Sequence, residues 1–128
     1  MIVVDASAAV ALILAESAQP LLAARLVRSP DRVMSPVSYA ELVMVLSRAD
    51  AKPKLLADAF LREAGIGIEP IDQRQTELAI QAFLRFGKGR HPARLNLGDC
   101  FSYAASKARD APLLFVGNDF GRTDVRCA

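Results

Sequence analysis

The stretch Ile2-Val3-Val4-Asp5-Ala6-Ser7-Ala8, directly after Met1, decides the fold. Its β-branched run predicts a short buried strand at residues 2–4. The alanine-rich sequence at residues 7–16 favours a helix, because alanine has the highest helix propensity. A strand that passes directly into a helix is the first unit of an alternating α/β fold.

The same alternation continues along the chain. Further strands are expected at residues 32–35, 66–71 and 113–116, and further helices at 21–28, 36–48, 54–64, 74–86 and 97–109. Ser35, Asp72 and Asn96 precede three of these helices and suit the N-cap position. Strands that alternate with helices predict a layered α/β fold with a parallel central sheet.

Length and composition indicate one globular domain at residues 1–128. A chain of 128 residues has the commonest domain size, and folding buries roughly two-thirds of its unfolded surface. With 52% hydrophobic and 23% charged residues, the chain is unlike a disordered protein. The net charge of +2 is too small to predict a nucleic-acid partner by itself, so that prediction needs a local basic patch.

Cysteine and histidine are scarce. Cys100 and Cys127 form no CxxC pair, and His91 is the only histidine, so a zinc site built from these residues is not expected. The two cysteines are better interpreted as reduced thiols of a cytoplasmic protein than as metal ligands. The apolar N-terminus has no Lys or Arg before Arg25 and so lacks the positive region of a signal peptide, and no apolar run is long enough to span a membrane.

Four acidic residues lie within or next to apolar sequence. Asp5 and Asp119 follow two of the expected strands, and ligands of open α/β sheets bind beyond the carboxyl ends of the strands. Glu41 interrupts the apolar stripe of its helix, and Asp99 lies in the first turn of another helix. The first two acids already predict a site at one edge of the sheet.

Each acid also has an ordinary structural explanation. Asp5 could cap the first helix, and Asp119 could be a turn residue. Asp99 would interact favourably with the dipole of its helix, by about 0.3–1 kcal/mol. The carboxylate of Glu41 could reach water or an arginine from the edge of the core. These alternatives require four separate explanations.

A shared site would explain all four acids together. Two carboxylates about 4 Å apart repel each other by roughly 4 kcal/mol at an effective dielectric constant of 20, so four in one place need a cation. Oxygen ligands suit Mg²⁺ or Mn²⁺, and Mg²⁺ commonly binds one or two carboxylates together with waters and substrate phosphate. This combination indicates phosphodiester chemistry.

Four segments carry a resemblance to a known family. They are Val3-Val4-Asp5-Ala6-Ser7-Ala8, Ser38-Tyr39-Ala40-Glu41, Asn96-Leu97-Gly98-Asp99-Cys100-Phe101-Ser102-Tyr103-Ala104, and Leu114-Phe115-Val116-Gly117-Asn118-Asp119-Phe120 with Thr123-Asp124. In this order and spacing, the chain resembles the PIN-domain ribonucleases, and among them the VapC toxins of VapBC toxin–antitoxin systems. The last two segments are the most specific.

The resemblance implies a single PIN domain with an α/β/α sandwich fold. It also implies a divalent-metal-dependent endoribonuclease, with Mg²⁺ or Mn²⁺ as cofactor, that is neutralised by a VapB-type antitoxin and forms a homodimer. The alternative is a PIN-like module that binds RNA or a partner without cleavage. The helices at 21–27 and 54–64 contain apolar residues that could contact a partner or simply cover the sheet.

Position by position, the resemblance assigns the catalytic and metal-binding roles to Asp5, Glu41, Asp99 and Asp119. We expect Asp5 and Asp99 to be direct metal ligands, and the other two acids to bind directly or through water. The supporting residues are Ser7, Asn96 and Asp124. The chain ends soon after the Thr123-Asp124 segment, which leaves little room for a final strand.

A basic loop is the expected source of contacts with RNA phosphates. Lys88, Arg90 and Arg94 lie within eight positions of one another. The alternative is a solvated loop that only aids solubility, because little aromatic sequence for base stacking lies nearby. A haloacid-dehalogenase-like phosphatase is a weaker rival, because it would need a second Asp where this chain has Ser7.

Overall fold

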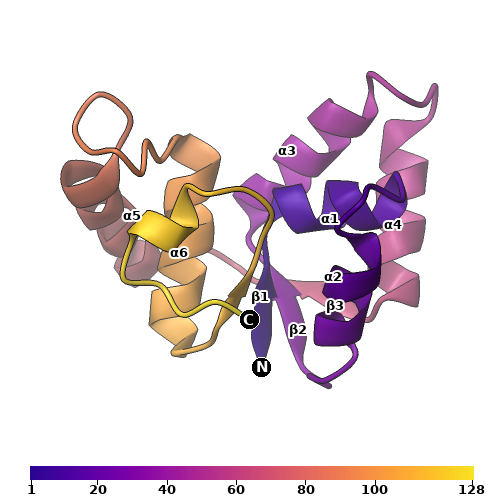
Figure 1. The fold of residues 1–128 in the computed structure, drawn as a ribbon, viewed down its shortest axis with the longest axis horizontal. Helices are drawn as coiled ribbons and strands as arrows, with labels where there is room; N and C mark the ends of the chain where they lie inside the picture. Colours follow the sequence, from indigo (N-terminus) through magenta and orange to yellow (C-terminus); the bar gives the residue numbers. More distant parts are fainter.

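The computed structural model describes all 128 residues as a sheet between two groups of helices (Figure 1). The strands are β1 (Ile2–Val4), β2 (Arg32–Met34), β3 (Ile66–Ile68) and β4 (Leu113–Leu114). The helices are α1 (Ala6–Ile13), α2 (Gln19–Leu26), α3 (Pro36–Leu46), α4 (Pro53–Glu63), α5 (Gln73–Phe86) and α6 (Leu97–Arg109), with a short 3₁₀ helix, η1 (Phe120–Arg122), near the C-terminus.

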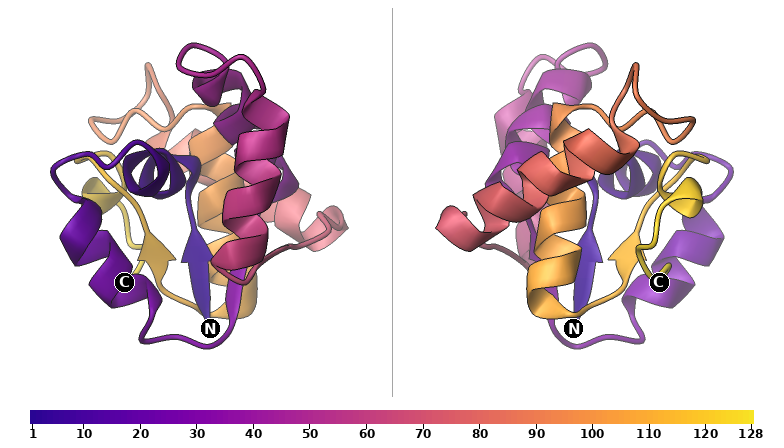
Figure 2. Two further views of the ribbon diagram at one scale, coloured as in Figure 1. Left: turned by 90° about the vertical axis from the view of Figure 1, so that its right-hand side faces the viewer. Right: turned by 90° about the vertical axis from the view of Figure 1, so that its left-hand side faces the viewer.

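The four strands form one parallel sheet in the order β3-β2-β1-β4. Helices α1 to α4 lie on one side of the sheet, and α5 and α6 lie together on the other (Figures 1 and 2). The predicted α/β sandwich with a parallel central sheet is therefore confirmed.

The sheet separates two hydrophobic cores. Ile2 and Val4 pack with the core under α1 to α4, whereas Val3 packs with the core under α5 and α6. Leu113 and Leu114 of β4 divide between the two cores in the same way. This division follows from the alternation of side chains along a strand, and it explains why β1 and β4 are apolar at every position.

The three predicted N-caps are present. The Ser35 hydroxyl accepts a hydrogen bond from the first turn of α3, and the Asp72 carboxylate accepts one from the first turn of α5. Asn96 caps α6. These caps fix where each helix begins, and the start of α6 becomes important for the site.

Several elements end earlier than predicted, and the physical reason can be seen for three of them. Strand β3 ends at Ile68, before Pro70, which lacks the N–H group that a strand ladder uses. Helix α1 ends at Ile13 because Ala15 has a φ of 50°, in the left-handed region. Strand β4 ends at Leu114, whose partner Val4 is the last residue of β1.

The C-terminal residues return to the sheet without forming a full strand. Leu113 makes a single parallel bridge with Cys127, and the Leu113 amide donates to the Arg126 carbonyl oxygen at 2.8 Å. A single bridge in place of a full strand agrees with the expectation that the C-terminal segment leaves little room for a final strand. None of the helices combines the length and apolar character needed to cross a membrane.

Candidate active site

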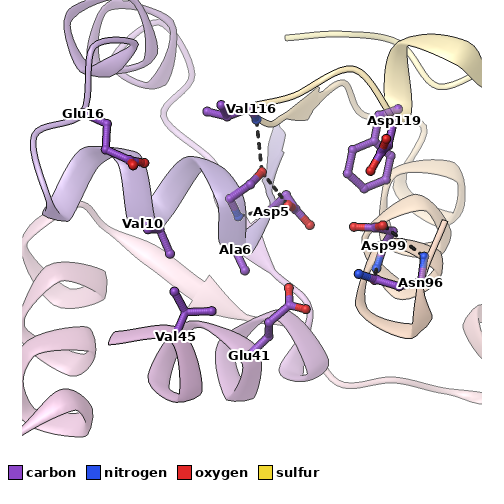
Figure 3. Close-up of a pocket in the computed structure, with 12 residues that line it drawn as sticks. Asp5, Ala6, Val10, Glu16, Glu41, Val45, Asn96, Asp99, Val116 and Asp119 are labelled. Carbon is purple, nitrogen blue, oxygen red and sulfur yellow. Dashed lines mark hydrogen bonds between the residues drawn. The ribbon is translucent and has the colours of Figure 1, made fainter. Parts of the chain in front are cut away.

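The four predicted acids line one cavity of about 350 Å³ (Figure 3). Asp5 follows β1 directly, and Glu41 projects from α3. Asp99 lies in the first turn of α6, and Asp119 precedes η1. The parallel sheet brings these segments together because β1 and β4 end at the same edge, where α1 also begins.

Two serines hold the carboxylate of Asp5, which is only 2% exposed. The Ser7 hydroxyl and amide donate to Oδ2 at 2.6 and 3.0 Å, and the Ser102 hydroxyl donates to Oδ1 at 2.5 Å. The Ser38 hydroxyl lies 2.8 Å from the Ser102 hydroxyl, and the Val116 amide donates to the Ser7 hydroxyl at 3.0 Å. Both oxygens of Asp5 are thus held in a fixed orientation.

Sequence reasoning assigned Ser7 a supporting role but missed Ser38 and Ser102. Each lies three positions from an acid on its own helix, Ser38 before Glu41 and Ser102 after Asp99. This spacing places a hydroxyl beside an acid on one helix face. The two serine–acid pairs, on separate helices, could have indicated in the sequence that these serines belong to the network around Asp5.

Asp99 and Asn96 form a capping box at the start of α6. The Asn96 side chain accepts from the Asp99 amide at 2.9 Å, and Asp99 Oδ2 accepts from the Asn96 amide at 3.1 Å. Asp99 therefore takes part in capping α6 as well as lining the cavity. The capping box also fixes the direction of the carboxylate.

Burial in the cavity, together with the charges of neighbouring acids, disfavours ionised carboxyl groups. Burial raises the pKa of Asp99 to about 7, and the charges of Asp5, Glu41 and Asp119 add to this, while the hydrogen bond from the Asn96 backbone acts to lower it. Burial also raises the pKa of Glu41, and the charge of Asp5 acts in the same direction. The acids are therefore close enough to affect one another's ionisation.

Glu41 rests against Gly98, the residue before Asp99. A Cβ atom at Gly98 would lie only 2.8 Å from Glu41 Oε2 and 3.1 Å from Cδ. A side chain larger than hydrogen at this position would therefore displace the carboxylate. The φ angle of Gly98 is not in the left-handed region, so the backbone conformation does not require glycine here. Glycine is required because α3 and α6 approach each other closely at this position.

Replacing Gly98 with Ala is expected to keep the fold and to lower activity by about tenfold to a hundredfold, because catalytic groups tolerate little displacement. The clash involves the end of a flexible side chain, so Glu41 can turn away without disturbing the core. Gly67→Ala is the matched control, since its Cβ would meet no atom closer than 3.9 Å. Rates of RNA cleavage, the activity that the sequence resemblance implies, and thermal unfolding of both variants measure this difference. An unaltered rate in Gly98→Ala would show that Glu41 needs no exact placement.

The acids share a cavity without crowding around one point. In this arrangement, no group of three or more Asp, Glu, His or Cys side chains is close enough together to hold one metal ion. Asp119 is exposed and does not cap η1 with its side chain. Glu16, which sequence reasoning did not select, lines the outer part of the same cavity (Figure 3).

Asp124, predicted as a supporting acid, does not line the cavity. Its carboxylate accepts a hydrogen bond from the Tyr103 hydroxyl at 2.7 Å and forms ion pairs with Lys107 at 3.1 Å and Arg85 at 3.6 Å. These contacts tie the C-terminal segment to α5 and α6. In this structure Asp124 therefore has a structural role.

The three basic residues predicted to bind RNA have different surroundings. Lys88 and Arg94 line a polar hollow together with Asn96 and Asp119, at the border of the acidic cavity. Arg90 instead donates to the Leu84 carbonyl oxygen and packs over a phenylalanine ring of α5. The structure thus places two of the three cations beside the acids.

Comparison with known proteins identifies the family. Residues 2–126 match the PIN domain family. The chain is 44% identical over 129 residues to ribonuclease VapC42 of Mycobacterium tuberculosis, with 98% of both chains covered. It is 41% identical over 124 residues to ribonuclease VapC of Mycolicibacterium smegmatis, with 96% of both chains covered.

The chain belongs to the VapC ribonucleases of the PIN-domain family. The resemblance read from the four sequence segments is therefore confirmed. A crystal structure of Mycobacterium tuberculosis VapC20, described as a Sarcin-Ricin loop cleaving toxin, matches this PIN domain with a TM-score of 0.77. That match covers 98% of this chain and 96% of the other at 20% sequence identity, and it supports the fold alone.

Proposed function

We propose that this VapC ribonuclease is a divalent-metal-dependent endoribonuclease whose acidic cavity is the active site. The observation that carries the proposal is the convergence of four carboxylates on one cavity, with the pKa of Asp99 raised to about 7. A cavity that disfavours its own negative charges is one in which a bound cation is stabilised.

The donor atoms of the cavity fit Mg²⁺ or Mn²⁺. All four acids offer carboxylate oxygens, which are the ligands that these hard ions prefer. Mg²⁺ retains several waters and binds one or two carboxylates, so a cavity of about 350 Å³ with separated acids suits a hydrated ion. When bound, the ion would supply a water of lowered pKa and neutralise charge at the phosphate.

The protein contributes placement of the reacting groups. Asp5 and Asp99 are the proposed direct ligands, because hydrogen bonds orient the carboxylate of each. Glu41 and Asp119 bind directly or through water, and one of them orients the attacking water. In the hydrolysis, the water oxygen forms the new bond to phosphorus, the bond to the leaving oxygen breaks, and the leaving oxygen takes up a proton.

Removal of divalent metal is expected to abolish cleavage. The purified chain is incubated with several unstructured RNAs in EDTA, in Mg²⁺ and in Mn²⁺, and RNA integrity is followed by gel. Cleavage that requires a divalent ion supports the proposal. Retention of intact RNA under all three conditions, with binding still present, would favour the module that binds without cleavage.

The basic residues at the rim are expected to contribute to RNA affinity through phosphate contacts. In a Lys88→Gln/Arg94→Gln double variant, the plot of log binding constant against log salt should become less steep by about 1.4, since each single-strand phosphate contact contributes about 0.7. An Arg48→Gln/Lys52→Gln double variant is the control, because both residues are exposed and line no cavity near the acids. Equal slopes in all three proteins would identify a solvated loop.

We also propose a VapB-type antitoxin and a second copy of the chain as protein partners, in the cytoplasm. Leu21 of α2 is 56% exposed, and Val27, directly after α2, is 70% exposed. Leu55 of α4 is 66% exposed. These exposed apolar side chains make α2 and α4 candidates for contact surfaces.

A further inference from the structure

Two buried serines connect the three elements that carry the acids around Asp5. Ser38 belongs to α3, one helical turn before Glu41, and Ser102 belongs to α6, one turn after Asp99. Both serines are fully buried. Their hydroxyl oxygens lie 2.8 Å apart, so the hydrogen bond between them joins α3 directly to α6. The Ser102 hydroxyl also donates to Asp5 Oδ1 at 2.5 Å, directly after the end of β1.

The direction of this chain of hydrogen bonds is fixed. A serine hydroxyl has one proton to donate, and Ser102 donates its proton to Asp5. In the hydrogen bond between the two serines, Ser38 is therefore the donor and Ser102 the acceptor. Hydrogen bonds aligned in one direction polarise and strengthen one another, so Ser38 acts on Asp5 through Ser102.

Within the chain, the hydrogen bonds to Asp5 leave one acceptor position of its carboxylate free. An ionised carboxylate has about four lone-pair positions, two on each oxygen. Oδ2 accepts from both the amide and the hydroxyl of Ser7, which takes up both of its positions. Oδ1 accepts from the Ser102 hydroxyl alone. The free position is therefore on Oδ1, the oxygen that Ser102 holds.

We propose that Ser102 and Ser38 are positioning residues of the metal site, which present Oδ1 of Asp5 to a divalent ion and keep Oδ2 from binding it. This inference rests on the proposed metal-dependent function of the acidic cavity. Neither serine lines that cavity, so both act through Asp5 and not by contact with the ion or with RNA. Their hydrogen bond also holds α3 against α6, and with them the two helices' own acids (Figure 3).

Discrimination between divalent ions is the consequence of holding Asp5 in this way. Mg²⁺ demands near-ideal octahedral geometry, whereas Ca²⁺ accepts irregular geometry and can take both oxygens of one carboxylate. A carboxylate that offers one oxygen in one direction therefore favours Mg²⁺ over Ca²⁺. Without the Ser102 hydroxyl, Asp5 gains a second free position on Oδ1 and is less firmly oriented, which removes part of the preference for Mg²⁺.

Metal affinity measured without RNA tests the role of the serines. The ¹⁵N-labelled protein, freed of metal with EDTA and dialysed at pH 8, is titrated separately with MgCl₂ and CaCl₂, and amide shifts are followed by NMR. Ser102→Ala is expected to weaken Mg²⁺ binding by about tenfold to a hundredfold, the usual effect of removing a group that orients a metal ligand. Ca²⁺ binding should weaken less. Ser38→Ala should act in the same direction with a smaller effect, because Ser102 still donates to Asp5.

Ser106→Ala is the matched control. Ser106 is another buried serine of α6, and its hydroxyl donates to the Ala111 carbonyl oxygen at 2.6 Å, away from the acidic cavity. Its removal should lower the unfolding temperature, because a buried hydrogen bond is lost, without changing the affinity for either ion. If Ser102→Ala behaves in the same way, with lower stability and an unchanged ratio of the two affinities, Ser102 only satisfies a buried polar group and the inference is wrong.

A crystal structure of the unmodified protein with Mn²⁺ decides the inference even if a variant fails to fold. An ion bound to Asp5 through Oδ1 alone supports it. An ion bound in the acidic cavity through Oδ2, or through both oxygens, overturns it and leaves the proposed metal-dependent nuclease intact. A cavity that binds no divalent ion, in the crystal or in the titrations, would overturn the proposed metal dependence together with this inference.

Discussion

Asp99→Asn is expected to lower metal-dependent RNA cleavage by at least about a hundredfold, the loss typical of removing one electrostatic group from an active site. The substitution removes the negative charge that a divalent ion needs as a ligand. It retains a side-chain oxygen that can accept from the Asn96 amide, so the capping box of α6 can persist. The loss of activity should therefore occur without loss of the fold.

The control for this variant is Asp72→Asn. Asp72 caps α5 and accepts from the Gln75 amide at 2.8 Å, but it lines a different part of the surface from the acidic cavity. Both variants replace a capping carboxylate by an amide, and only Asp99→Asn should reduce the initial rate of cleavage in Mg²⁺. Full activity of Asp99→Asn with an unchanged metal requirement would remove Asp99 from the metal site.

The sequence was sufficient to predict the order of elements because local signals agreed with one another. The β-branched run Ile2 to Val4 favours a strand, and Ser35, Asp72 and Asn96 begin helices by their own side-chain chemistry. Ends of elements were less predictable. Helix α1 stops early because of the backbone conformation of Ala15, which no side-chain pattern announces.

The convergence of the acids on one cavity was also predictable, since a parallel topology brings the ends of neighbouring strands to one edge. The groups that orient them were not. Ser102 reaches Asp5 across 97 positions of sequence, and Glu41 packs on Gly98 only because α3 and α6 lie against each other. Such contacts depend on tertiary packing, so one sequence without the fold identifies the residue types but not the pairs.

The basic loop shows the same limit. In the sequence, Lys88, Arg90 and Arg94 are equivalent cations of one segment. In the structure, Lys88 and Arg94 lie beside the acids, whereas Arg90 donates to the Leu84 carbonyl oxygen of α5. The folded loop therefore separates cations that the sequence alone does not distinguish, which makes Lys88 and Arg94 the pair to test for contacts with RNA.

The stability of the metal-free protein is expected to fall as pH rises from about 4 to about 7. Burial, reinforced by the charges of neighbouring acids, raises the pKa of Asp99 from 3.8 to about 7 in the folded state. Between these values, the folded protein holds more protons than the unfolded chain, so stability decreases with increasing pH. The raised pKa of Glu41 contributes in the same direction.

Unfolding midpoints in EDTA, measured at pH 5 and pH 8, test this dependence. Asp99→Asn should reduce the difference between the two midpoints and should be more stable than the unmodified protein at pH 8. Asp31→Asn is the control, because Asp31 is exposed and precedes β2 at the opposite edge of the sheet. A difference that is equal in all three proteins would show that Asp99 is not the titrating group.

Divalent metal should reverse the pH dependence, because the ion binds only ionised carboxylates. Adding Mg²⁺ at pH 8 is expected to raise the midpoint of the unmodified protein by mass action, and to have little effect at pH 5, where protons compete for the same oxygens. In Asp99→Asn the stabilisation by Mg²⁺ should be largely lost. Because this comparison needs no RNA, it separates metal binding by the four acids from every later step of cleavage, and stabilisation that is equal in both proteins would place the ion elsewhere.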